Sequence, residues 1–138
     1  MHTDPHGLEL STRSAEAAQA IAGLPQRFAG FKLDVADRVK AALTADPHWA
    51  YAHLLRGYLL LLLGNSALLP AAAKALAAAE PLLEGGTERE RQHGAALRAW
   101  IAGDLAGAER TLAAVVTRWP RDLLALRLPP ACQDQPNS

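Results

Sequence analysis

Three glycine–proline pairs with equal internal spacing constrain the fold of this chain more than any other feature. In each pair the proline follows the glycine by 17 residues, and the pairs are Gly30–Pro47, Gly64–Pro81 and Gly103–Pro120. Successive glycines are 34 and then 39 residues apart. A glycine just past a helix accepts the left-handed conformation that ends it, and a proline cannot continue the next helix. The spacing therefore predicts an array of helix–turn–helix repeats.

The second helix of each repeat carries apolar residues at helical spacing. They recur at i, i+4, i+7 and i+8, which places them on one helix face. The three stripes are Val35, Val39, Ala42 and Leu43; Leu69, Ala73, Leu76 and Ala77; and Ala108, Leu112, Val115 and Val116. Half of the chain is hydrophobic, mostly alanine and leucine, which favours helices. We therefore expect an all-α fold without a sheet.

Helix boundaries follow from the same patterns. We expect helices at about 14–29, 33–45, 49–63, 67–83, 87–102 and 105–119, with a helical stub at 121–128. The longer repeat predicts a lengthened, exposed connection over 82–87 that is not helical throughout. The alternative is a fourth helix that runs on to about residue 84. Pro25 should end or kink the first helix, and Pro70 fits only near the start of the fourth. Gly57 is expected to let the two helices of its repeat approach closely.

These motif positions resemble tetratricopeptide repeats, whose period is 34 residues. GDLAGAERTLAAVVTRWP looks like the second half of such a unit, and ADPHWAYAHLLRGYLLLLLGN resembles a junction and the following first helix. Residues 8–128 as a whole are similar to the amino-terminal part of the tetratricopeptide repeat protein 38 family. The resemblance implies a right-handed α-α superhelix of about three repeats over 1–128, with units near 14–47, 48–86 and 87–120, the stub at 121–128 and an irregular tail at 129–138.

Composition and charge exclude several classes of partner. Fourteen basic residues balance fourteen acidic ones, so no basic face for nucleic acid or an acidic membrane is indicated.

The most apolar run, Tyr58–Leu63, is too short to span a bilayer and predicts a buried helix. The amino terminus lacks the regions of a signal peptide. Cys132 is the single cysteine, which is typical of a reducing compartment, and we expect a cytoplasmic protein.

The candidate metal ligands favour structural roles. Glu90-x-x-His93 is half of a di-iron carboxylate motif, but the sequence has no second copy. Thr87 and Glu90 fit a helix capping box better. His48 and His53 do not share a helix face, and His2 and His6 lie near the terminus, where only adventitious metal binding is expected. We expect neither a metal nor a cofactor.

The sequence gives equally little support for an anion-binding site or a catalytic nucleophile. Arg89, Arg91 and Arg98 alternate with acidic residues, which favours a solvated mixed-charge face over a phosphate or carboxylate site. Cys132 has no fixed basic neighbour that would lower its pKa. We expect no catalytic residue in the chain.

The resemblance also implies a binding face, because the first helix of each tetratricopeptide unit lines a concave groove. That groove carries Tyr51, Leu54, Tyr58, His93, Leu97 and Trp100. The lysines and asparagines with which chaperone-binding members hold a peptide carboxylate are absent from these positions. An apolar groove of this kind suits a hydrophobic helix or peptide, or a second copy of the chain. The alternative for the nearby Leu61, Leu62 and Ile101 is simple packing between helices.

The stub supplies a candidate self-association surface. Its apolar residues are Leu123, Leu124, Leu126 and Leu128, and Pro129-Pro130 stops it before a full helix covers the third unit. Terminal units of a repeat array need a polar outer face, which this end lacks. We therefore expect a homodimer through these leucines, with the groove as the alternative interface.

The sequence thus predicts a noncatalytic protein-interaction scaffold of tetratricopeptide type. Its partner would be a hydrophobic peptide or helix, or the protein itself. One alternative is a fragment of a larger enzyme or enzyme subunit whose active residues are absent from this chain. Another is a fragment without a function of its own.

Overall fold

The computed structural model describes residues 2–3, 7–22, 32–63, 66–122, 124–125 and 128 of the 138-residue chain, and six α-helices account for most of them. The helices are α1 (Ala15–Ala20), α3 (Lys32–Ala45), α4 (Ala50–Leu62), α5 (Leu69–Ala79), α6 (Glu88–Ile101) and α7 (Leu105–Arg118). Two 3₁₀ helices, η1 (Ser66–Leu68) and η2 (Glu80–Gly85), flank α5. The prediction of an all-α architecture is confirmed.

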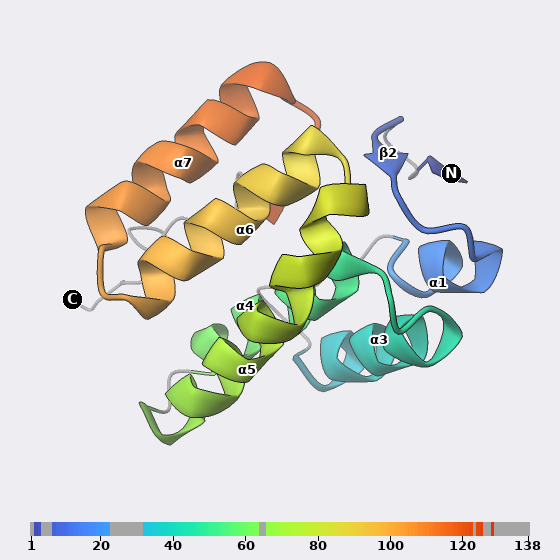
Figure 1. The fold of residues 1–138 in the computed structure, drawn as a ribbon, viewed down its shortest axis with the longest axis horizontal. Helices are drawn as coiled ribbons and strands as arrows, with labels where there is room; N and C mark the ends of the chain where they lie inside the picture. The colour runs from blue at the N-terminus through green and yellow to red at the C-terminus, as the bar shows by residue number, and fades with distance from the viewer. Residues whose placement is uncertain are drawn as a thin grey trace.

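Helices that are neighbours in sequence are also neighbours in space (Figure 1). α1 packs on α3, α4 on α5, and α6 on α7, while α4 and α5 also contact α6. The molecule is therefore a succession of helix pairs, with α4 in its middle in contact with α3, α5 and α6.

The ends of α6 and α7 follow the expected local chemistry. Thr87 and Glu90 form a reciprocal capping box at the start of α6, as predicted. Gly103 has φ of +87° directly after α6, the left-handed conformation that a glycine adopts at least cost. Asp104 then accepts a hydrogen bond from the Gly107 amide and so caps α7. Pro70 lies in the first turn of α5, where a proline is tolerated.

Two predicted boundaries need correction. α1 ends at Ala20, well before residue 29. A proline at position 25 conflicts with the carbonyl of residue 21 in a continuous helix, and Pro25 itself lies outside the described residues. The connection at 82–87 follows the alternative of a longer fourth helix, because it is helical to Gly85, as η2. Glu84 and Gly85 are exposed as expected, whereas Leu83 is buried. Leu83 anchors η2, because its Cδ1 packs tightly against the α-carbon side of Gly94 on α6.

The expectation of a chain without a sheet also needs correction. Strand β1 (His2–Thr3) pairs antiparallel with β2 (Glu9–Leu10), in a register that joins His2 to Leu10 and Thr3 to Glu9. Leu10 is buried in the core, and this apolar anchor holds the pair against the helices. The strands are only two residues each, so the helical class is unaffected.

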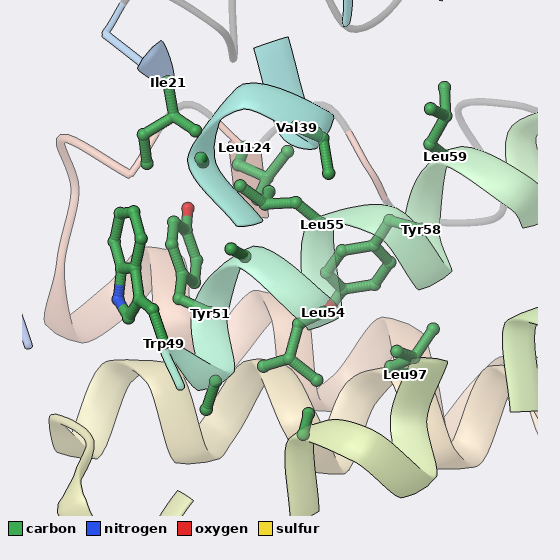
Figure 2. Packing of buried hydrophobic residues seen from close by; sticks show 14 of the residues in the cluster. Ile21, Val39, Trp49, Tyr51, Leu54, Leu55, Tyr58, Leu59, Leu97 and Leu124 are labelled. Carbon is green, nitrogen blue, oxygen red and sulfur yellow. The ribbon is translucent and has the colours of Figure 1, made fainter. Parts of the chain in front are cut away.

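The core is one hydrophobic cluster centred on α4, which contributes Tyr51, Leu54, Leu55, Tyr58 and Leu59 (Figure 2). Gly57 lies in the same helix, and a Cβ there would come within 2.6 Å of Leu97 Cδ2 on α6. The predicted close approach at Gly57 is therefore made with α6 of the following pair, and not with the partner helix α5.

Candidate functional site

The six residues of the predicted groove meet where α4 faces α6, and we call them the inner face. The Tyr58 ring stands edge-on to the His93 ring with 5.7 Å between their centroids. The ring centroids of Tyr51 and His93 are 5.9 Å apart, and those of Tyr58 and Trp100 are 6.1 Å apart. Leu54 and Leu97 belong to the same cluster. The fold therefore brings together residues from two helix pairs, α4–α5 and α6–α7.

The inner face is not an open groove, and in this respect the prediction is wrong. Five of its residues are buried, namely Tyr51, Leu54, Tyr58, His93 and Leu97. Trp100 is half-buried. A peptide cannot reach these buried side chains in this structure. One residue that follows α7, Asp122, contacts the inner face directly, with its Oδ2 2.8 Å from His93 Nε2.

Four described residues near the carboxyl end are Asp122, Leu124, Ala125 and Leu128, and we call them the C-terminal segment. All four are buried. The Ala125 amide donates to Asp122 Oδ1 at 3.0 Å, and the Leu128 amide donates to the Leu124 carbonyl at 2.9 Å. These bonds make one helical turn. Leu124 and Leu128 belong to the hydrophobic core cluster, in which Figure 2 labels Leu124.

The predicted self-association surface is contradicted at the two of its four leucines that can be described. Leu124 and Leu128 pack inside their own chain instead of facing solvent. The prediction assumed that the stub had no intramolecular neighbour, whereas these two leucines belong to the hydrophobic core of the chain. Leu123 and Leu126 lie outside the described residues.

Asp122 fixes the C-terminal segment on the inner face. Its Oδ2 accepts a hydrogen bond from Arg89 Nη1 at 3.0 Å and lies 2.8 Å from His93 Nε2. Burial raises the pKa of Asp122, but the His93 ring and the Arg89 guanidinium lower it more, so that the pKa lies well below its ordinary value. The carboxylate is therefore charged at neutral pH, and a buried ion pair holds the segment.

Arg89 departs from its prediction. Its side chain is only 3% exposed, so it does not belong to a solvated mixed-charge face. The guanidinium lies 5.2 Å from the centre of the Tyr51 ring, and Nη2 donates to the Glu9 carbonyl at 3.4 Å. Burial lowers the pKa of Arg89, but Tyr51 and Asp122 raise it by more than burial lowers it. The guanidinium therefore stays charged. The sequence could have indicated this burial, because Arg89 stands four residues before His93 and therefore lies on the same helix face.

Tyr58, His93 and Asp122 form a line of hydroxyl, imidazole and carboxylate. Tyr58 Oη lies 3.0 Å from His93 Nδ1 and donates to the His93 carbonyl at 3.0 Å, while Nε2 of the ring faces Asp122. Such a line has the order of groups of a general-base relay. All three side chains are nevertheless buried, and burial raises the pKa of Tyr58 well above its usual value. The Tyr58 hydroxyl is therefore protonated and out of reach of a substrate. The three side chains join α4, α6 and the C-terminal segment by hydrogen bonds, which is a structural role.

Glu90 is a second buried charged residue with several hydrogen bonds, and it joins Ser11 of the amino-terminal segment to α6. Glu90 Oε1 accepts from the Ser11 hydroxyl at 2.6 Å, and Oε2 accepts from the Ser11 amide at 3.1 Å. Trp49 Nε1 donates to the same Oε2 at 3.3 Å. The capping role of Glu90 was predicted, whereas its bonds to Ser11 and Trp49 were not. Across the described residues, no three histidine, cysteine, aspartate or glutamate side chains are grouped as a metal site requires.

The remaining predicted groups do not converge on one site. Arg91 donates to the carbonyls of Leu83 and Gly86. Arg98 pairs with Glu80 on the surface. His53 Nε2 lies 2.8 Å from the Pro47 carbonyl, and His48 is exposed. The side chains of His2, His6 and Cys132 lie outside the described part of the chain.

An open groove of about 550 Å³ lies between α3 and α4. It is lined by Ala36, Val39, Lys40, Leu43, Thr44, Arg56, Leu59, Leu60 and Leu63. The predicted buried run Tyr58–Leu63 is therefore buried only at its start, since Leu63 is exposed. Nothing in the repeat pattern indicated this groove.

The run Ser66–Gly85, which comprises η1, α5 and η2, is long and apolar enough to cross a membrane by length and composition alone. Its mean hydropathy is 1.2, and 22% of the run is buried in the fold. It includes Lys74 and packs on α4 and α6.

Comparison of the chain with protein-family models, with curated proteins and with solved structures gave no match. The resemblance to the tetratricopeptide repeat protein 38 family stays a prediction.

Proposed function

We propose that this chain is a noncatalytic interaction module of tetratricopeptide type whose inner face binds a short acidic and apolar peptide. The observation that carries the proposal is the C-terminal segment itself, whose Asp122 binds Arg89 and His93 while Leu124 and Leu128 are buried in the core. Its pattern is a carboxylate followed by leucines two and six residues later, at Asp122, Leu124 and Leu128.

The inner face is suited to a carboxylate because Arg89 and His93 approach it from one helix. Hydrogen bonds that involve a charged donor and a charged acceptor are stronger than neutral ones and fix the register of the ligand. A charge left buried without its partner is strongly unfavourable, so a peptide without the carboxylate is rejected.

Two leucines supply the apolar part of the recognition. Each fully buried leucine side chain contributes about 1.5–3 kcal/mol relative to exposure. Both belong to the hydrophobic core cluster, which also contains Leu54, Tyr58 and Leu97 of the inner face. The helical turn between them resembles the groove-bound helices that display apolar anchors on one side.

A full-length Leu124→Asp variant tests the proposal. The added charge should release the C-terminal segment, and a fluorescent peptide of residues 119–128 should then bind the vacated face saturably. The unmodified chain should bind the peptide at least about tenfold more weakly, because a tethered segment competes at an effective concentration on the order of 1 mM. Fluorescence anisotropy measures both affinities.

Leu105→Asp is the matched control, because Leu105 is 47% exposed on α7 and its replacement should change nothing. A second peptide with Asp122→Lys should not bind the Leu124→Asp variant. Asp122→Asn, which keeps the shape of the side chain, is the milder releasing variant. The proposal fails if either releasing variant stays helical by circular dichroism and yet ignores the peptide. A concentration-dependent dimer that Leu124→Asp abolishes would identify a second copy of the chain as the occupant.

A further inference from the structure

The α3–α4 groove lies on a different side of α4 from the inner face. Its α4 residues are Arg56, Leu59, Leu60 and Leu63. In contrast to the inner face, it is covered by no described segment, and its volume of about 550 Å³ lies within the ordinary range of small-molecule pockets, about 300–1,000 Å³.

The groove has a polar end and an apolar end. α3 and α4 run in opposite directions, joined by residues 46–49, so the end of α3 lies beside the start of α4 (Figure 1). Thr44 and Arg56 therefore belong to the end near this connection, with Lys40 next to them along α3. Ala36 and Leu63 belong to the far end, where the lining is entirely aliphatic.

The polar end carries two uncompensated positive charges. Lys40 and Arg56 are both exposed, and neither forms an ion pair within the described part of the chain. None of the described residues that line the groove carries a carboxylate. An anionic group is therefore the complement of this end.

A peptide is a poor complement for the other end. Each residue of a bound peptide brings a backbone N–H and C=O, and a polar group buried without a partner is unfavourable. The three polar side chains of the lining, Lys40, Thr44 and Arg56, all lie toward one end. An alkyl chain makes no such demand on the aliphatic end.

We propose that the α3–α4 groove binds a single-chain anionic amphiphile, an alkyl carboxylate. Its chain lies along Leu59, Leu60 and Leu63, and its carboxylate reaches Arg56 and Lys40. The site is independent of the inner face and of peptide binding.

Isothermal titration with octanoate, decanoate and dodecanoate, each below its micelle concentration, tests the apolar end. The affinity should rise about fourfold per methylene group, the fold-change that corresponds to burial of a CH₂ group. Decanol, which matches decanoate in length but lacks the charge, should bind at least tenfold more weakly.

The charged end is tested by the double variant Lys40→Gln and Arg56→Gln. Its affinity for decanoate should fall to that for decanol, whereas Arg110→Gln, an exposed arginine on α7, should leave both unchanged. Equal affinities of the unmodified chain for decanoate and decanol overturn the proposal, as does a double variant that keeps the preference. Binding to anionic vesicles without any binding of monomeric carboxylates also overturns it and assigns the groove to a lipid surface.

Discussion

α4 meets its neighbours in two different ways. Where it faces α6, aromatic rings and leucines are buried, and a buried ion pair between Arg89 and Asp122 joins the C-terminal segment to α6. Where it faces α3, a groove with six aliphatic residues stays open between the helices. The same helix thus has a closed side and an open side. The difference indicates that the apolar pattern of the helices does not by itself determine which side of α4 is buried.

The largest effect is expected from the ion pair on the closed side. Asp122→Ala should destabilise the protein by about 3–5 kcal/mol, because the Arg89 guanidinium stays buried without its counter-charge. Glu80→Ala is the control, since Glu80 and Arg98 are 38% and 59% exposed, and an exposed pair contributes at most about 1 kcal/mol. Urea denaturation followed by circular dichroism measures both. Equal losses would show that the leucines alone close this side.

A smaller effect is expected where α4 touches α6. Gly57→Leu should destabilise the protein by about 1–3 kcal/mol or more, because the first added atom already collides with Leu97 in a fully buried site. Gly85→Leu is the matched control, since a Cβ there meets nothing within 4 Å. Thermal melting of the two variants separates them. An unchanged melting temperature for Gly57→Leu would mean that the closed side is loosely packed.

Much of this closed side follows from local sequence. Thr87 and Asp104 cap helices and Gly103 ends one through neighbours three or four residues away, so the boundaries of α6 and α7 were predictable. The meeting of Tyr58 with His93 was predictable as well, because helix periodicity and the repeat length set which faces oppose each other.

The covering of that side was not predictable in the same way. Asp122 meets Arg89 across 33 positions, and Ser11 meets Glu90 across 79. No local pattern encodes such pairs. The stub leucines were correctly recognised as apolar, but whether they turn inward depends on Asp122 finding a buried cation. The groove on the open side depends on the shapes of the side chains between α3 and α4, which periodicity does not describe.

The pH dependence of stability should reflect the closed side. Since the pKa of Asp122 is lowered in the folded state, its stabilisation is complete above about pH 4, the unfolded value, and is lost as the pH falls further. Burial raises the pKa of Tyr58, so its contribution is complete below about pH 10 and is lost above it. Asp122→Asn should flatten the acid limb and Tyr58→Phe the alkaline limb of a denaturation series. If a variant left its limb unchanged, the ionisation of that residue would not be the cause of the pH dependence of stability.

Hydrogen exchange of the unmodified protein tests most directly whether the C-terminal segment is a displaceable occupant of the inner face. The amides of Ala125 and Leu128 are bonded within the segment, whereas those of Leu54 and Leu97 lie in the helices beneath it. We predict that the segment amides exchange through an opening of lower free energy than the helix amides, which should stay protected until global unfolding. Exchange of both sets with one common free energy would contradict this account, because the segment would then be an inseparable part of the core.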